Sequence, residues 1–232
     1  NQRFATPLQS VNLVTGDMRA SAVLGAETSL PLDRSNLVIE NAGLVSDAGW
    51  TSAADALRLA LRREGPEPNR YRLAIEADAF APPAALRDGG NSPLSQALDV
   101  MRIDMSATFT GPWDRFAVET ARPQFTAIHL HQAEAHWGEL EFEAAGFVSG
   151  ATAGRVSGEI TLRLTNWRGI VALMRASGQV SDGVINTIET GLEFLAGVSG
   201  NAKTLDVPLT LDQGVARIAI IPLGKLPPLI LR

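Results

Sequence analysis

The sequence contains no cysteine. This absence excludes disulfide bonds, zinc sites built on thiolates, and catalysis by a cysteine nucleophile. Basic residues are also in the minority, since 20 lysines and arginines face 25 acidic residues and the formal charge is −5. No basic cluster is larger than the pair Arg62-Arg63. The chain therefore lacks the positive patch with which proteins bind nucleic acid, and we expect no such partner.

Long apolar runs are missing as well. No stretch approaches the roughly 18 consecutive apolar residues that a membrane-spanning helix needs. The chain begins at Asn1 rather than at a methionine. We expect a fragment or a processed form, because a removed signal or anchor segment, or the choice of a cloned region, would give this start.

The usual signatures of catalysis are absent too. The sequence has no Gly-x-Ser-x-Gly elbow, no His-Glu-x-x-His, no Gly-x-x-x-x-Gly-Lys and no Gly-x-Gly-x-x-Gly. Interpretations as a serine hydrolase, a metalloprotease, a P-loop protein or a dinucleotide-binding protein therefore have no support. We expect a protein that is not an enzyme and that uses no cofactor.

What the sequence does have is alternation of apolar and polar residues with a period of two. Segments 71–79 and 101–109 show it most strongly, and 18–24, 37–39, 140–142 and 160–164 repeat it. Such alternation predicts half-buried strands of an antiparallel sheet, with one face buried and the other wet. Segment 52–63 is ambiguous, because its alanines and leucines favour helix. We interpret it as a strand, since Leu57, Leu59 and Leu61 keep the period of two.

The last third of the chain changes period twice. Gly154 to Thr165 alternates, about thirty residues then follow a helical spacing, and Leu205 to Ile220 alternates again. We expect Asn166 and Asp182 to cap two helices, and Gly197 or Gly200 to end the second. The sequence thus predicts a single domain over residues 1–232. Its fold is α+β and β-rich, a twisted antiparallel sheet with a two-helix insert at about residues 167–197.

The two expected helices carry an apolar stripe that the sheet or a ligand must cover. Packing in the core is the ordinary use of such a stripe, because isolated helices are marginally stable. The sharper hypothesis is a site for an apolar ligand between sheet and helices. Its candidate ligand-binding residues are Trp167, Leu173, Ile188, Leu192 and Leu195.

One constellation suits a metal ion. His129 and His131 are two residues apart on an expected strand and so point to one face, where Glu134 or His136 would complete a zinc-like site. The apolar alternation shifts between Leu130 and Ala133, so His136 joins the pair only if a bulge lies between them. Two-ligand motifs are weak, and we expect no metal site.

Several short segments together resemble the uncharacterised bacterial family DUF2125, over nearly the whole chain. They are Ala81-Pro82-Pro83-Ala84-Ala85-Leu86, Pro112-Trp113-Asp114, Ala121-Arg122-Pro123, Trp137-Gly138, Gly158-Glu159-Ile160 through Asn166-Trp167, and Ile221-Pro222-Leu223-Gly224 with Pro227.

This resemblance carries expectations about location and function. The family is grouped with AsmA-like envelope proteins, which typically have an N-terminal inner-membrane anchor followed by a β-rich periplasmic body. Some larger relatives are proposed to move or organise lipids along an apolar groove. The resemblance implies a periplasmic protein, tethered to the inner membrane by an anchor that this chain lacks, that binds lipid or another apolar ligand. The alternative is an envelope scaffold that binds a protein partner and no ligand.

Overall fold

The computed structural model describes residues 2–5, 10–88, 96–120, 122–150, 154–178, 180–201, 203–218 and 221–231. Its strands are β1 (Gln2–Ala5), β2 (Ser10–Val14), β3 (Met18–Leu24), β4 (Leu32–Ser46), β5 (Thr51–Arg63), β6 (Arg70–Asp78), β7 (Val100–Phe109), β8 (Phe125–Trp137), β9 (Leu140–Gly150), β10 (Val156–Thr165), β11 (Thr204–Asp212), β12 (Val215–Ile218) and β13 (Ile221–Lys225). Its helices are α1 (Ala84–Asp88), α2 (Arg115–Glu119), α3 (Trp167–Ser177) and α4 (Asp182–Ser199).

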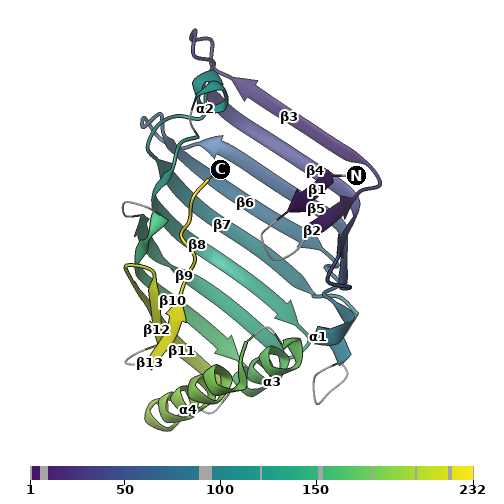
Figure 1. Ribbon diagram of the computed structural model, residues 1–232, viewed down its shortest axis with the longest axis vertical. Helices are drawn as coiled ribbons and strands as arrows, with labels where there is room; N and C mark the ends of the chain where they lie inside the picture. Colours follow the sequence, from purple (N-terminus) through teal and green to yellow (C-terminus); the bar gives the residue numbers. More distant parts are fainter. Residues whose placement is uncertain are drawn as a thin grey trace.

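Within the described residues, 13 strands form one antiparallel sheet (Figure 1). From β4 to β13 each strand pairs with the next in sequence, and the path begins with β1 and β2. The long strand β4 has two partners on one edge, since β3 pairs with its first half and β2 with its last residues. The sheet is not closed, because β1 and β13 end the path. The predicted β-rich α+β fold is confirmed.

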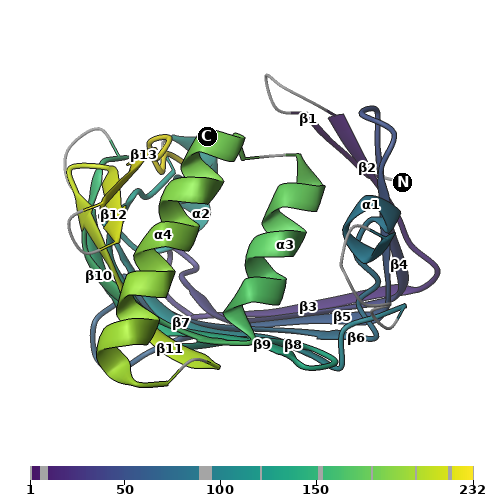
Figure 2. The same cartoon turned by 90° about the horizontal axis from the view of Figure 1, so that it is seen from below.

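The sheet bends into a gutter, with β4 rising on one side and β10 to β13 on the other (Figure 2). Gly146 lets the backbones of β9 and β10 approach closely at the side of the sheet formed by β10 to β13. A Cβ at this position would lie 2.3 Å from the carbonyl oxygen of Glu159 on β10. In β8 a register shift between Leu130 and Ala133 adds a bulge, which increases local bending. These features give the sheet a concave and a convex face.

Helices α3 and α4 lie across one end of the gutter on its concave side (Figures 1 and 2). Their positions match the predicted insert, and Gly200 ends α4 with φ 71°, as predicted. Asn166 is the N-cap residue of α3, as predicted, but its side-chain amide donates to the carbonyl of Glu139 at 2.7 Å and makes no capping hydrogen bond. The predicted cap of the second helix was wrong. The residue at the N-cap of α4 is Ser181, and Asp182 is the first helical residue.

Two strand predictions had opposite outcomes. The ambiguous segment is strand β5, so the period of two outweighed the helix propensity of its alanines. Strand β3 was expected to be half-buried, and this was wrong: all seven of its residues are exposed. The strand pairs only with β4 at the edge of the sheet, so its weak alternation has no covered face to match.

Candidate functional site

Strand pairing carries the apolar residues of eight strands, β4 to β11, to one face, the concave face. The register brings them into rows that cross the sheet from wall to wall. One row is Leu37, Leu59, Ile75, Ile103, Ala133, Ala144, Leu162 and Val207, and the next is Leu61, Leu73, Met105, Leu130, Gly146, Ile160 and Leu209. The concave face is therefore apolar across the width of the sheet.

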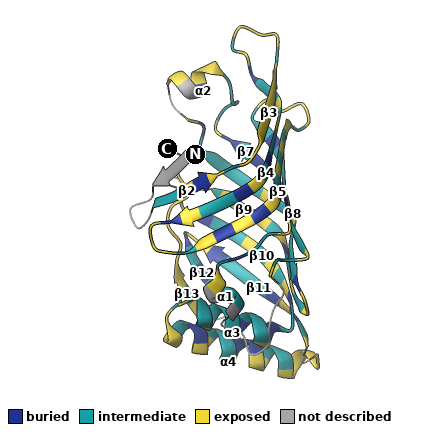
Figure 3. Ribbon diagram, turned by 90° about the vertical axis from the view of Figure 1, so that its right-hand side faces the viewer, coloured by how far each residue is buried: buried dark blue, intermediate teal, exposed yellow. Residues whose placement is uncertain are grey.

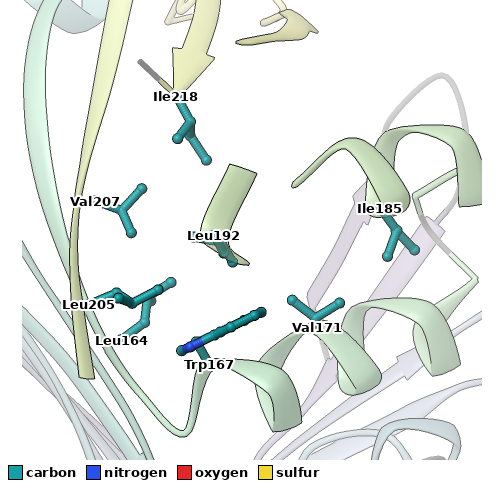
Figure 4. Close-up of a cluster of buried hydrophobic side chains, with 8 residues drawn as sticks. All are labelled: Leu164, Trp167, Val171, Ile185, Leu192, Leu205, Val207 and Ile218. Atoms are coloured by element: carbon teal, nitrogen blue, oxygen red, sulfur yellow. The ribbon is translucent and has the colours of Figure 1, made fainter. Parts of the chain in front are cut away.

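The helices cover this face at one end only. Trp167 and Ile185 are fully buried there, and Leu205 on β11 is 1% exposed. Figure 4 shows these side chains pointing toward one another from α3, α4 and the strands. The buried members of this helix-covered cluster are Leu164, Trp167, Val171, Ile185, Leu192, Leu205, Val207 and Ile218. This end of the gutter is an ordinary close-packed core.

The opposite end is covered by aromatic residues from strand ends and loops. Phe109 lies against the rings of Tyr71, Trp113 and Phe125, at centroid distances of 6.0, 5.6 and 4.8 Å. The buried Tyr71 hydroxyl accepts a hydrogen bond from the backbone N–H of Trp113 at 3.1 Å. Burial raises the pKa of this phenol. The far end is thus also closed by packing.

Between the two covered ends lies an apolar strip. We define it by six side chains of the concave face: Leu59, Leu73, Ile75, Ile103, Met105 and Leu130. Each is half-buried, and none belongs to, or packs against, the clusters of buried side chains found among the described residues. Figure 3 illustrates the half-burial, since β7 and β8 are mostly in the colour of intermediate burial. The middle of the concave face is apolar without being core.

The C-terminal segment 226–231 runs on the concave side of the sheet (Figure 1). Gln124 holds its end with two hydrogen bonds, because its side-chain amide donates to the carbonyl of Leu231 and accepts from the N–H of Leu231, each at 3.0 Å. Leu231 packs against the aromatic end, whereas Leu226, Leu229 and Ile230 stay exposed. The segment therefore adds exposed apolar side chains to the concave side.

Comparison with known families gives a match that covers nearly the whole chain. The model of the family described as "Uncharacterized protein conserved in bacteria (DUF2125)" covers residues 1–227. The chain belongs to this family. No solved structure matches it. Among the residues described for this DUF2125 chain, no helix has the length and apolar content needed to span a bilayer.

The structure places the five predicted ligand residues of this DUF2125 chain at the helix-covered end. Trp167 and Leu192 are buried members of that cluster, and Ile188 and Leu195 pack against it. Leu173 is half-buried on α3 and is not part of the cluster. Four of the five residues are thus brought together by contacts with each other and with the sheet.

The histidines lie on the convex face. The bulge that the sequence left open exists, and it brings Glu134 and His136 to the side of His129. The Glu134 carboxylate already accepts hydrogen bonds from Gln132 and Arg102, at 2.8 and 3.1 Å. Within the described ranges no three His, Cys, Asp or Glu side chains are arranged to hold a metal ion.

His131 instead contacts Ser106 on β7. Its Nε2 lies 2.7 Å from Ser106 Oγ, and its ring lies beside that of His129 at 4.3 Å. Ser106 is only 3% exposed, so its hydroxyl is not open to an external substrate in this conformation. A hydrogen bond from Ser106 also lowers the pKa of Glu64 below its ordinary value. The group is a partly buried hydrogen-bonded network on the convex face.

Sequence reasoning missed the apolar strip as a candidate site, although it identified every residue in it. Alternation shows which side chains share a face, and we expected that face to be buried throughout. It does not show how much of the face another layer covers. Two short helices cannot cover a sheet of this width, and that comparison of sizes was the signal available in the sequence.

Proposed function

We propose that this protein is a non-enzymatic envelope protein that binds a lipid chain, or a similar apolar ligand, on the apolar strip. It works on the periplasmic side of the inner membrane, to which an N-terminal segment outside this chain tethers it. The periplasmic location and the tether rest on the resemblance to AsmA-like proteins. The binding of an apolar ligand rests on the strip itself.

The observation that supports ligand binding is the half-buried state of six adjoining large apolar side chains. Large apolar patches on monomeric proteins usually mark a site where another molecule binds. An acyl chain gains about 0.8 kcal/mol for each CH₂ group removed from water, so ten buried groups offer about 8 kcal/mol before the costs of ordering. The walls of the gutter and its two covered ends would keep such a chain along the strip.

A scaffold function is the second candidate, and a different surface favours it. Phe194 and Val198 are four residues apart on α4, so they share a side of the helix. They are 70% and 72% exposed. An exposed apolar pair on a helix is a common anchor for a protein partner. This function needs no ligand on the concave face.

Native mass spectrometry of the protein purified from bacterial membranes in mild detergent separates the two candidates. Under our proposal the protein carries a copurifying lipid whose mass is measured directly. In Met105→Gln, which places a polar side chain of nearly the same size on the strip, the lipid-bound fraction falls while the melting temperature changes little. Met18→Gln on the exposed strand β3 is the matched control and keeps the lipid.

Either of two results would reject lipid binding on the strip. The first is a wild-type protein that carries no lipid. The second is a lipid that is retained equally by Met105→Gln and Met18→Gln, because such a lipid binds elsewhere. Loss of a copurifying protein on Phe194→Ser, with no lipid in any variant, would support the scaffold.

A further inference from the structure

Three arginines face one another across neighbouring strands on the convex side of the sheet. Arg34 on β4 is the register partner of Arg62 on β5, and Arg62 is the partner of Arg72 on β6. These strands lie side by side in the sheet (Figure 1). Like charges directly opposite each other destabilise a sheet. A row of three such residues therefore calls for a compensating anion.

The carboxylates near this arginine row compensate it only in part. Asp104 on β7 accepts two hydrogen bonds from Arg72, at 2.8 and 2.5 Å. Glu64 pairs with Arg70, and Glu76 pairs with Arg102. Among the described residues, Arg34 and Arg62 form no ion pair within 4 Å and no side-chain hydrogen bond, although the charge of Arg62 helps to lower the pKa of Asp104, and both arginines are exposed. Two guanidinium groups thus remain available beside one that is engaged.

The arginine row borders a hollow of about 330 Å³. Ala60 and Ala74 are register partners in the neighbouring row, and their small side chains leave the space open. Asn36 and Asp104 lie in the same row as the alanines, on the strands to either side. The hollow is therefore large enough for a small anion and has arginines along one side.

We propose that this hollow binds a phosphoryl group, held by Arg34, Arg62 and the free donors of Arg72. Guanidinium groups bind phosphate oxygens in pairs, with charge-assisted hydrogen bonds, which makes phosphate the anion that fits a row of arginines best. The Asn36 amide supplies a further donor. This site lies on the face opposite the apolar strip and does not depend on lipid binding there.

Isothermal titration calorimetry with inorganic phosphate tests the site directly, at an ionic strength kept constant with sodium chloride. The wild type binds one phosphate, and Arg62→Gln weakens the affinity by about tenfold or more, as does Arg34→Gln. Arg155→Gln is the matched control, since it removes one positive charge from an exposed arginine outside the hollow. Its affinity for phosphate is unchanged.

Thermal unfolding provides a second readout that a purely structural role would not give. Without phosphate, Arg62→Gln unfolds at a higher temperature than the wild type, because it removes repulsion within the arginine row. Phosphate raises the unfolding temperature of the wild type and of Arg155→Gln, and it has no such effect on Arg62→Gln. Sodium chloride at the same ionic strength does not reproduce the increase.

Sedimentation with lipid vesicles distinguishes the source of the phosphoryl group. If phosphatidylglycerol vesicles retain the wild type better than Arg62→Gln, and phosphatidylcholine vesicles retain neither, the ligand is an anionic lipid headgroup. If only inorganic phosphate binds in a manner that requires Arg62, the ligand is a free phosphate or a soluble phosphate ester. The proposal is overturned if neither probe binds, or if both bind Arg62→Gln as well as they bind the wild type.

Discussion

The two ends and the middle of the concave face have the same kind of sequence and different surroundings. At the helix-covered end, Leu205 is 1% exposed and packs among side chains from α3 and α4. In the middle, Leu73 stands on the same face of the same sheet and is half-buried outside the clusters of the described residues. Alternation decides which face a leucine occupies, and the second layer decides whether it becomes core.

The contrast has a direct consequence for how apolar residues are used. In the covered end, an apolar side chain contributes to folding, since it is removed from water when the chain folds. In the apolar strip each side chain keeps part of its surface in water, so part of that contribution is still available in the folded protein. A ligand that covers the strip would remove this remaining apolar surface from water, and the free energy released would favour binding.

The largest expected effect comes from truncating one leucine in each region. Leu205→Ala leaves a cavity in the covered end and should lower the free energy of unfolding by about 2–5 kcal/mol. Leu73→Ala removes a side chain that is already partly in water and can leave no closed cavity, so it should cost about 1 kcal/mol or less. Chemical denaturation of both variants measures the difference. Equal losses would show that the strip is packed as tightly as the core.

Enlarging a side chain should show the same order of tolerance, with the strip more tolerant than the covered end. Leu192→Trp overpacks a residue that is 2% exposed and should cost about 1–3 kcal/mol. Ile103→Trp places the same ring on the strip, where it has room, and should leave the melting temperature nearly unchanged while it displaces an apolar ligand. Thermal unfolding, together with recovery of lipid, checks both. A large loss of stability in Ile103→Trp would contradict an uncovered strip.

The smallest expected effect concerns the convex face, where the two regions carry the same kind of ion pair. Arg72 behind the strip, and Arg163 behind the covered end, each donate two hydrogen bonds to an aspartate, Asp104 and Asp206. These hydrogen bonds hold the pKa of each carboxyl below its ordinary value of 3.8. The Arg163–Asp206 pair is exposed and the Arg72–Asp104 pair is only partly buried, so solvent screens both pairs and each contributes little to stability.

The dependence on pH follows from the direction of these shifts. A carboxyl group with a lowered pKa in the folded state stabilises the fold above its unfolded pKa, and this contribution is lost as the pH falls through the folded value. Between about pH 4 and pH 2, Asp104→Asn and Asp206→Asn should each lose less stability than the wild type. The two variants should behave alike in denaturation at each pH. A much larger effect of one aspartate would show that the backs of the two regions differ as well.

The sequence was sufficient for the sheet, its apolar face and the position of the helices, because each depends on local period. The period of two identified strand β5 despite its alanines, and the helical spacing after Trp167 identified α3 and α4. The hydrogen-bond partner of the Asn166 side chain was not predictable, because it is the carbonyl of Glu139, 27 residues away in sequence. The same limit applies to the bulge at His131, which depends on pairing with β7 and β9.

The candidate site could be predicted only in part, for a related reason. Sequence patterns located ligand binding on the helical stripe, where the structure places Trp167 and Leu192 in a closed cluster. The apolar strip is the part of the concave face between the helix-covered end and the aromatic end. How the walls of the sheet enclose it depends on the curvature of the whole sheet. Gly146 and the bulge contribute to that curvature through contacts between strands.

Photocrosslinking tests the central claim, that the strip is open and binds an apolar chain. Residues 73 and 74 are adjacent on β6, and their side chains lie on the concave and the convex face respectively. Each is replaced in turn by p-benzoylphenylalanine, and the protein is irradiated with vesicles of phosphatidylethanolamine and phosphatidylglycerol. Mass spectrometry should find lipid adducts at residue 73 and few at residue 74. Equal labelling at the two positions, or none at residue 73, would contradict lipid binding on the apolar strip.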